Sequence, residues 1–439
     1  MLKRTRSFLV LVMLLMTVTM SAQVTTATMS GKVTAQDEPI IGATIVAIHE
    51  PSGTRYGTVT NVSGQFNLQG MRTGGPYKVE ISYVGYQTAI YKGINLLLGE
   101  NYVLNVSLKE SSELLDEVVV TASKESNMKS DRAGAIMNAN RDMISNTPTI
   151  SRSISDIMRL SPQGADVGNG FAVGGGNYRQ SFVTVDGAAF NNTFGLGGNL
   201  PANGSPISLD ALEQVTVAVT PFDVRQSGFT GGAINAVTRS GDNQFRGTAY
   251  MYFNNENLKG SKVDDYELLR SKAQYYTYGA SFGGPIIKDK LFFFVNGEYE
   301  DNVTAGSNYR PRTALGESYS GGNIHRPVQS EMDDMRGCLL NKYNFDPGKY
   351  NDYSTDTPAY RVMARVDWNA NQNNKVSFRF TKTHTKDSNF PTSSVSPLST
   401  SALYPGGTST EVIDGKPVGT IAPGQGRTSK YALSFSNSN

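Results

Sequence analysis

The chain contains a single cysteine and a single tryptophan among its 439 residues. One thiol cannot form an internal disulfide, so the fold must be stabilised by packing and by sheet pairing. Cys338 lies in the stretch GCLLNKY with no adjacent base, which argues against a nucleophilic cysteine. We therefore expect neither a disulfide scaffold nor cysteine-based catalysis.

An excess of charge of either sign is also absent. Lysine and arginine total 40, aspartate and glutamate total 38, and the net charge is +2. This balance lacks the basic footprint that a nucleic-acid-binding chain usually shows. We expect no nucleic-acid partner.

Long hydrophobic runs are rare. The 13-residue run Phe8–Met20 follows three positive charges within the first six residues. It is too short to span a bilayer comfortably, and it has the layout of a secretory signal. We expect a signal peptide over residues 1–22, cleaved after Ala22, so that the mature chain begins near Gln23. An uncleaved anchor is the alternative. No other run approaches 18 apolar residues, so we expect no membrane-spanning helix.

Glycine and two aromatic residue types are abundant instead. Glycine supplies 45 residues, above the usual share of about 7%, and tyrosine and phenylalanine supply 22 and 19. This composition is typical of β-rich structure with many turns. Over residues 24–110, apolar and polar residues alternate in short runs such as Lys78–Ser82 and Tyr102–Leu108. Turn signals recur every 8–12 residues or so, which predicts a small β-sandwich.

Residues 124–241 mix helical and strand patterns. Apolar residues at helical spacing from Ile150 to Met158 predict a short helix that Pro162 ends. We interpret this region as a compact mixed α/β domain. Its other expected elements are a helix over 209–213 capped by Ser208 and strands over 181–185, 215–219 and 233–238.

Two glycine-containing stretches invite comparison with nucleotide-binding loops. GNGFAVGGG does not have the G-x-G-x-x-G spacing, and no helix is expected to begin on it. VIDGKPVG lacks the first glycine and the Ser/Thr of a P-loop. We interpret both as tight turns and expect no nucleotide cofactor.

From residue 242 onward, apolar and charged residues alternate over runs of about ten residues, the length of a strand in a transmembrane β-barrel. In YRVMARVDW, for example, Tyr360 and Val362 alternate with Arg361 and Arg365. A soluble sandwich also alternates, so the period alone does not decide. The expected strands are 244–254, 274–284, 291–301, 359–369, 375–385 and 429–436.

Connection lengths favour the barrel. Short connections at 285–290 and 369–374 alternate with long ones at 255–272, 302–358 and 386–428. Outer-membrane barrels alternate short periplasmic turns with long outer loops in this order. Six strands are fewer than the minimum of about eight. We therefore expect residues 242–439 to be the incomplete start of a large antiparallel barrel, in an N-terminal fragment or the product of a disrupted gene.

The segment from GKVTAQDEPIIGATIVAIHE to YKVEISYVGYQT resembles the carboxypeptidase regulatory-like domain. The enzyme behind that name needs a histidine, a glutamate three residues later and a distant histidine as zinc ligands. His49, His325 and His384 are followed at that spacing by serine, valine and aspartate. We therefore predict that the chain is not an enzyme and has no catalytic residue, metal site or cofactor.

The order of sandwich, LDEVVVTAS, glycine-rich domain and barrel resembles the TonB-dependent outer-membrane receptors. GFTGGAINAVTRSGDNQFRGTAY and GGPIIKDKLFFFVNGEYE look most like the Oar-like branch. The SusC-like branch is similar, but its plug usually has another stretch where this chain has FAVGGGNYRQSFVTVDG. The resemblance implies that residues 124–241 are a plug inside the barrel. It also implies the outer membrane of a Gram-negative bacterium, with the N-terminal domain in the periplasm.

The resemblance further implies a TonB box over residues 115–123. Consecutive valines favour extended backbone, and an exposed strand can be captured by a strand of another protein. We expect the box to lie outside the sandwich, the plug core and the barrel, where energised TonB can pull on it and remodel the plug. An ordinary terminal strand of the sandwich is the alternative. The implied TonB-binding residues are Asp116, Glu117, Val118, Val119, Val120 and Thr121.

The predicted function is TonB-dependent active transport of a ligand across the outer membrane through a plugged β-barrel. The implied partners are TonB with its inner-membrane energising complex, outer-membrane lipids, and an unknown ligand such as a peptide, glycan or metal chelate. A surface lipoprotein is a further candidate, although the plug stretch argues against an obligate lid. The alternative is a non-transporting adhesion or surface-matrix protein. A signalling receptor is disfavoured because the N-terminal module lacks the secretin-like pattern.

One acidic loop leaves calcium binding open. DPGKYNDYSTD contains Asp346, Asn351, Asp352 and Asp356. These are oxygen ligands that calcium accepts, but their spacing is not that of an EF-hand. A solvated acidic loop is the simpler interpretation.

Overall fold

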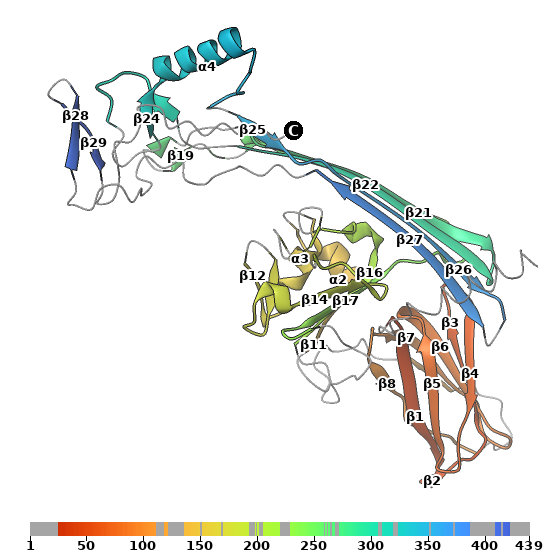
Figure 1. Ribbon diagram of the computed structural model, residues 1–439. Coiled ribbons are helices and arrows are strands. Elements are labelled where there is room, and N and C mark those ends of the chain that lie inside the picture. Colours follow the sequence, from red (N-terminus) through yellow and green to blue (C-terminus); the bar gives the residue numbers. More distant parts are fainter. Residues whose placement is uncertain are drawn as a thin grey trace, which may run out of the picture. The chain divides into compact units, whose positions relative to one another are not determined.

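The computed structural model describes most of the residues from 25 to 421 (Figure 1). The signal peptide expected over 1–22 and the strand expected over 429–436 lie outside the described residues. Within the described part, no helix is long and apolar enough to cross a membrane. The described residues are 25–110, 118–121, 136–149, 152–167, 170–192, 198, 200–201, 205–219, 229–258, 260, 262–263, 266–267, 272–305, 310–318, 324–350, 353–371, 374–386, 409–413 and 416–421.

The chain divides into two compact units, each of which is described by itself. The first unit comprises Met1–Ala249, Gly279–Glu298 and Tyr360–His384. The second comprises Tyr250–Tyr278, Tyr299–Ala359 and Thr385–Asn439.

The N-terminal part of the first unit consists of two sheets with an apolar core between them (Figure 1). One sheet contains β1 (Ala27–Ala35), β2 (Glu38–Pro39), β5 (Gln65–Met71), β8 (Asn101–Val103) and β9 (Val106–Ser107). The other has the order β10-β7-β6-β3-β4 and contains β3 (Thr44–His49), β4 (Thr54–Val59), β6 (Gly74–Ser82), β7 (Ala89–Leu96) and β10 (Val118–Thr121).

Alternation along the strands builds this core. In β6, Tyr77, Val79 and Ile81 are fully buried, while Lys78 and Glu80 lie on the other face and form a 2.7 Å ion pair. Two sheets whose inward-facing residues are apolar form a core by stacking face to face, as these two do. The predicted β-sandwich is therefore confirmed.

We expect the isolated segment 24–110 to fold as a soluble domain. Its core cluster is built from residues between Ala27 and Leu108, so the segment contains a complete apolar interior. The measurement is circular dichroism with a thermal melt, and the expected result is a β-type spectrum with one cooperative transition. A disordered spectrum without a transition would show that the sandwich depends on the rest of the chain.

The next part of the first unit is a five-stranded sheet with short helices, the mixed α/β domain that the sequence predicts. The sheet has the order β11-β16-β17-β14-β15, with β14 and β17 parallel. The elements are β11 (Ile136–Ala139), α2 (Arg141–Asn146), α3 (Ile154–Met158), β12 (Gly164–Asp166), β13 (Phe171–Val173), η1 (Tyr178–Gln180), β14 (Phe182–Val185), β15 (Ala188–Ala189), η2 (Leu209–Ala211), β16 (Leu212–Ala218) and β17 (Ala233–Thr238).

Two details differ from the sequence prediction. The helix expected over 209–213 is a single 3₁₀ turn that ends at Ala211. Strand β16 begins at the next residue, and all but one of its residues are buried. Helix α2 was not predicted. Its signal is local, since the Asn140 side chain accepts a 2.9 Å hydrogen bond from the Met143 amide and caps the helix.

Five long strands form the third part, and Figure 1 labels four of them, β21, β22, β26 and β27. They lie in one sheet in chain order, and they match the five expected strands that fall within the described residues. Strands β21 and β22 run past their predicted ends, to Ile287 and Ala305. The strands are β18 (Arg246–Asn255), β21 (Gln274–Ile287), β22 (Leu291–Ala305), β26 (Ala359–Asn369) and β27 (Lys375–Thr385).

In β22 and β26, burial is largely inverted relative to a water-soluble protein. Among the exposed side chains are Val295, Tyr299, Val362 and Trp368, whereas the alternate positions bury Asn296, Glu298, Arg361, Arg365 and Asp367. A soluble sandwich would bury the apolar set. An apolar outer face with a polar inner face is what a strand between lipid and a barrel interior needs. The burial pattern therefore settles what the alternation alone left open.

The second unit contains several short elements within the connections that were predicted to be long. A 15-residue helix, α4, occupies part of the 302–358 connection and was not predicted. None of its residues is buried, and its sequence has no apolar stripe that would have indicated a helix. The elements are η3 (Glu256–Leu258), β19 (Lys262–Val263), β20 (Tyr266–Glu267), β23 (Arg310–Arg312), β24 (Ile324–Val328), α4 (Gln329–Tyr343), β25 (Ser354–Asp356), β28 (Ser409–Ile413) and β29 (Lys416–Ile421).

The acidic loop of this unit is only partly described. Asp346 forms a 3.5 Å ion pair with Arg336 and accepts a 3.0 Å hydrogen bond from the Gly348 amide. Asn351 and Asp352 lie outside the described residues. Within the described part of the chain, no group of three or more histidine, cysteine, aspartate or glutamate residues is placed to hold a metal ion.

Candidate functional site

The segment expected to be a TonB box is a strand of the sandwich where the structure describes it. Residues Val118–Thr121 form β10, which pairs in parallel with β7 from Val118 opposite Ala89 to Thr121 opposite Lys92. The expectation that this segment lies outside the sandwich is wrong for these four residues. Extended valines favour a strand, but the sequence does not show which sheet edge is open to receive it. Asp116 and Glu117 lie outside the described residues.

β10 is the terminal strand of its sheet. Among the described residues, β7 is the only strand that pairs with it. A strand in that position presents one row of backbone N–H and C=O groups to its neighbour and leaves the other row open. β10 can therefore accept an added strand from another chain.

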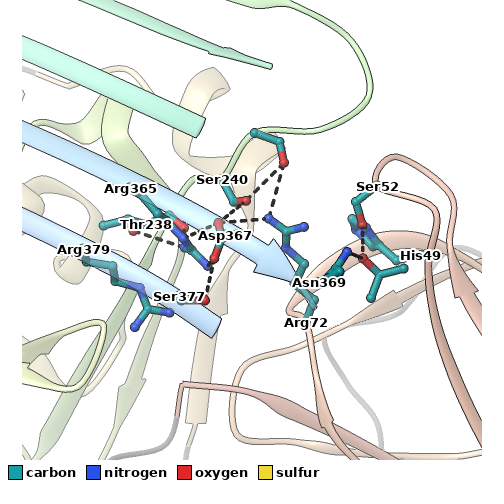
Figure 2. Close-up of polar contacts among 12 residues, drawn as sticks. His49, Ser52, Arg72, Thr238, Ser240, Arg365, Asp367, Asn369, Ser377 and Arg379 are labelled. Atoms are coloured by element: carbon teal, nitrogen blue, oxygen red, sulfur yellow. Dashed lines mark hydrogen bonds and ion pairs between the residues drawn. The ribbon is translucent and has the colours of Figure 1, made fainter. Parts of the chain in front are cut away.

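A second feature is a cluster of polar side chains around the buried residues Thr238, Arg365 and Asp367, called here the polar junction; Figure 2 shows its members other than Asp186. It joins the sandwich, the α/β domain and the inner face of β26 and β27, all within the first unit. Its members are Arg72, Asp186, Thr238, Ser240, Arg365, Asp367, Ser377 and Arg379.

Asp367 is the most heavily bonded carboxylate of the polar junction. Its two oxygens accept hydrogen bonds from Arg365, at 2.8 Å from Nε and 3.1 Å from Nη2. The Ser240 and Ser377 hydroxyls each donate to it at 2.6 Å. Arg72 of the sandwich forms an ion pair with the same carboxylate at 3.5 Å. A buried charge is tolerated when it is paired and hydrogen-bonded in this way.

Asp186 is the matching carboxylate on the α/β domain. It lies with Gly187 at the turn between β14 and β15, where both residues have positive φ, 50° and 83°. Asp-Gly suits such a two-residue turn because both positions tolerate left-handed backbone. Asp186 accepts hydrogen bonds from the backbone amide and hydroxyl of Thr238, and its oxygens lie 3.9 Å from Arg365 and 3.5 Å from Arg379. The end of β17 is thereby tied to the barrel strands.

A second buried ion pair lies further along the same strands. Glu298 of β22 and Arg361 of β26 are 2.9 Å apart, and each side chain is only 2% exposed. The Ser208 hydroxyl donates to Glu298 at 2.8 Å, and Arg361 donates to the backbone carbonyl of Ser205. The barrel strands thus hold the α/β domain at a second point, again through polar contacts.

Comparison with known proteins agrees with this architecture. Residues 28–109 match the carboxypeptidase regulatory-like domain, and residues 237–414 match the outer membrane beta barrel domain. The chain is 27% identical over 256 residues to the TonB-dependent transporter Oar of Myxococcus xanthus, a match covering 57% of this chain and 22% of that protein. It is 29% identical over 269 residues to the TonB-dependent receptor SusC of Bacteroides thetaiotaomicron, a match covering 58% and 24%. The chain is therefore similar to TonB-dependent outer-membrane receptors over more than half of its length, and we refer to it as a receptor on this ground.

Solved structures of receptors resemble the chain in part. The siderophore receptor PirA of Acinetobacter baumannii is 16% identical with a TM-score of 0.38, and the match covers 57% of this chain and 31% of that one. The ferric enterobactin receptor PfeA of Pseudomonas aeruginosa is 15% identical with a TM-score of 0.40, covering 58% and 33%. The matched part of this chain spans less than a quarter of each of the two curated relatives. Its location is the outer membrane of a Gram-negative bacterium.

The predicted site residues and the observed site of this receptor overlap little. The predicted set was the TonB box, whose binding role stays a prediction. The polar junction was not predicted. A signal existed, because Arg361, Arg365 and Asp367 occupy the polar face of an alternating strand, the face that a barrel strand turns toward the barrel interior. The absence of enzymatic activity also stays a prediction.

The receptor's sandwich contains a buried histidine beside the polar junction (Figure 2). His49 Nδ1 lies 2.7 Å from the Ser52 hydroxyl, which lies 2.7 Å from the Thr54 hydroxyl. Burial, and then the positive charge of Arg72, lower the pKa of His49 from 6.5 to about 3. His49 is therefore neutral in the folded sandwich at every pH above that value.

This lowered pKa predicts an acid sensitivity of the sandwich. The unfolded histidine takes up a proton below about pH 6.5 whereas the folded one does not, so stability is complete above pH 6.5 and falls as the pH falls toward 3. At pH 4.5 the expected loss is about 2–3 kcal/mol, from about 1.4 kcal/mol per pH unit. The measurement is urea unfolding of segment 24–110 at pH 7 and 4.5, with His49→Asn as control. Equal losses in both proteins would contradict the assignment to His49.

Proposed function

We propose that this receptor imports a ligand across the outer membrane, driven by a TonB partner that captures the box residues Asp116–Thr121. The observation that carries the proposal is β10, which among the described residues pairs on one side only and is placed immediately before the plug in the sequence. Capture by an added strand forms several backbone hydrogen bonds side by side. These bonds resist a pull along the strand because all of them bear the force at the same time.

The way the plug is held supports the same function. Its contacts with the barrel strands include the two buried polar clusters around Asp367 and Glu298. A buried ion pair stays intact while both partners are in place, yet it adds little net stability over an apolar contact. A plug held in this way is secure at rest, and its polar groups can be rehydrated when a pull separates them. Contacts of that kind suit a plug that must move and return.

The plug also has apolar contact with the wall. Phe294 and Met363 of the barrel strands belong to the same buried cluster as Ile234 and Val217 of the plug sheet. These contacts give the plug a fixed resting position. We propose that the transported ligand is a peptide, a glycan or a metal chelate, because the family resemblance implies these classes.

The test uses the full receptor in its own host, with and without the TonB gene. The probes are a tryptic peptide digest, an oligosaccharide digest and a mixture of ferric chelates, and mass spectrometry measures their depletion from the medium. We expect depletion of one probe class that requires both the receptor and TonB. Depletion that is unchanged without TonB would contradict the proposal. Cell-surface attachment that needs the receptor but not TonB would favour the adhesion alternative.

A further inference from the structure

The box strand and the plug are connected through the sandwich as well as through the chain between them. β10 is paired with β7, and β7 leads within two residues to Leu98, which contacts the plug sheet. We propose that the sandwich presents the box as a preformed edge strand and transmits the pull to the plug, while β10 stays on β7. This inference rests on the proposed function, because it assumes that a TonB strand captures the box.

The pairing with β7 orders the box in advance. Fixing the backbone of one residue costs about 1–2 kcal/mol, and four residues of the box are already extended. A partner strand that adds to the open row of β10 does not have to meet that cost. Nor does it have to displace β7, because successive residues of a strand direct their hydrogen-bonding groups to opposite sides.

β7 is firmly seated in the sandwich. It pairs with β6 from Ile81 opposite Ala89 to Gly74 opposite Leu96. Its side chains Ile94 and Leu96 are each 1% exposed in the sandwich core. A pull on β10 therefore acts on the whole sandwich, because β7 cannot slide without disrupting that core.

The sandwich touches the plug just after β7 ends. The Leu98 amide donates a 3.1 Å hydrogen bond to the Gln214 side chain of β16. The Leu98 side chain, 2% exposed, packs with Val237 of β17 in a small apolar cluster of their own. The next residue of β17 is Thr238, whose carbonyl accepts a hydrogen bond from Arg365 of the polar junction. The path therefore runs from β10 through β7 and Leu98 to the contact that holds β17 against the wall.

A reversible cross-link between β10 and β7 tests whether the box must leave the sandwich. Thr121→Cys and Lys92→Cys place thiols on paired residues of neighbouring strands, about 4.8 Å apart, within the span of a disulfide. Lys92 is exposed, so the core is untouched. Cys338→Ser removes the native thiol. The assays are binding of the purified periplasmic domain of TonB to the full receptor, and depletion of the probe digests by cells.

We expect the oxidised form to bind TonB and to take up probe within about twofold of the reduced form. Binding and uptake that vanish on oxidation and return on reduction would show that the box must leave β7, and would overturn the inference. The proposed function is tested by a different variant. If Val119→Pro leaves TonB binding intact, the proposed function is contradicted, regardless of the result with the cross-link.

A second variant tests the other end of the path. Leu98→Ala is expected to lower uptake at least fivefold with TonB binding unchanged, because the sandwich would lose the apolar contact between Leu98 and Val237 of the plug sheet. The matched control is Val103→Ala on the same domain, at a residue 49% exposed, which should change neither. If the reduced cysteine variant fails to bind TonB, Leu98→Ala alone decides, and unchanged uptake then contradicts the inference.

Discussion

Val119→Pro is expected to abolish uptake by the receptor and to weaken TonB capture at least tenfold, while expression in the outer membrane is retained. Proline has no backbone donor and fixes φ near −65°, so at least one rung of the strand is lost on one side of β10. A backbone hydrogen bond contributes about 0.5–1.5 kcal/mol net, and 1.4 kcal/mol is already a tenfold change in affinity. Folding should be spared, because the sandwich core lies between Ala27 and Leu108.

The matched control is Val119→Ala, which keeps the backbone donor. Capture of an extended strand is made through main-chain groups, so we expect the alanine variant to stay within about twofold of the wild type. The measurement is TonB binding together with probe depletion in cells. Wild-type uptake by the proline variant would remove the box from the mechanism. Loss of outer-membrane expression together with uptake would show that β10 is needed for folding.

Asp367→Ala is expected to loosen the plug. The substitution leaves Arg365 buried without the carboxylate that accepts two of its hydrogen bonds, and it removes the partner of Arg72, Ser240 and Ser377. Breaking a buried ion pair from one side costs about 3–5 kcal/mol. The urea concentration at which trypsin begins to cut within the plug should therefore fall by about 1 M or more.

Ser377→Ala is the control for this variant. It removes one 2.6 Å hydrogen bond from the same carboxylate and leaves the ion pair with Arg365 in place. A single hydrogen bond contributes about 1 kcal/mol, so the shift should be clearly smaller. Equal shifts in the two variants would mean that the ion pair does not hold the plug. A receptor that unfolds as a whole in either case would contradict the assignment of Asp367 to the contact between plug and wall.

Much of the fold could be predicted from the sequence because its signals are local. A strand has a period of two, so the alternation in YRVMARVDW fixes both the strand Ala359–Asn369 and its two faces. The same holds for the sandwich strand that carries Tyr77, Val79 and Ile81. Helix α4 has no apolar stripe, so it offered no such signal.

The tertiary structure decided what these faces and edges meet. The sequence shows that Val118–Thr121 prefer to be extended, but only the fold shows that the open edge of β7 receives them. The sequence also shows that Arg365 is polar and faces inward. Only the fold shows that Asp186 and Asp367 neutralise Arg365 and that Arg72 of the sandwich joins them. Strand period and turn chemistry depend on neighbouring residues, whereas the pairing of a buried charge or of a sheet edge depends on residues that only folding brings together.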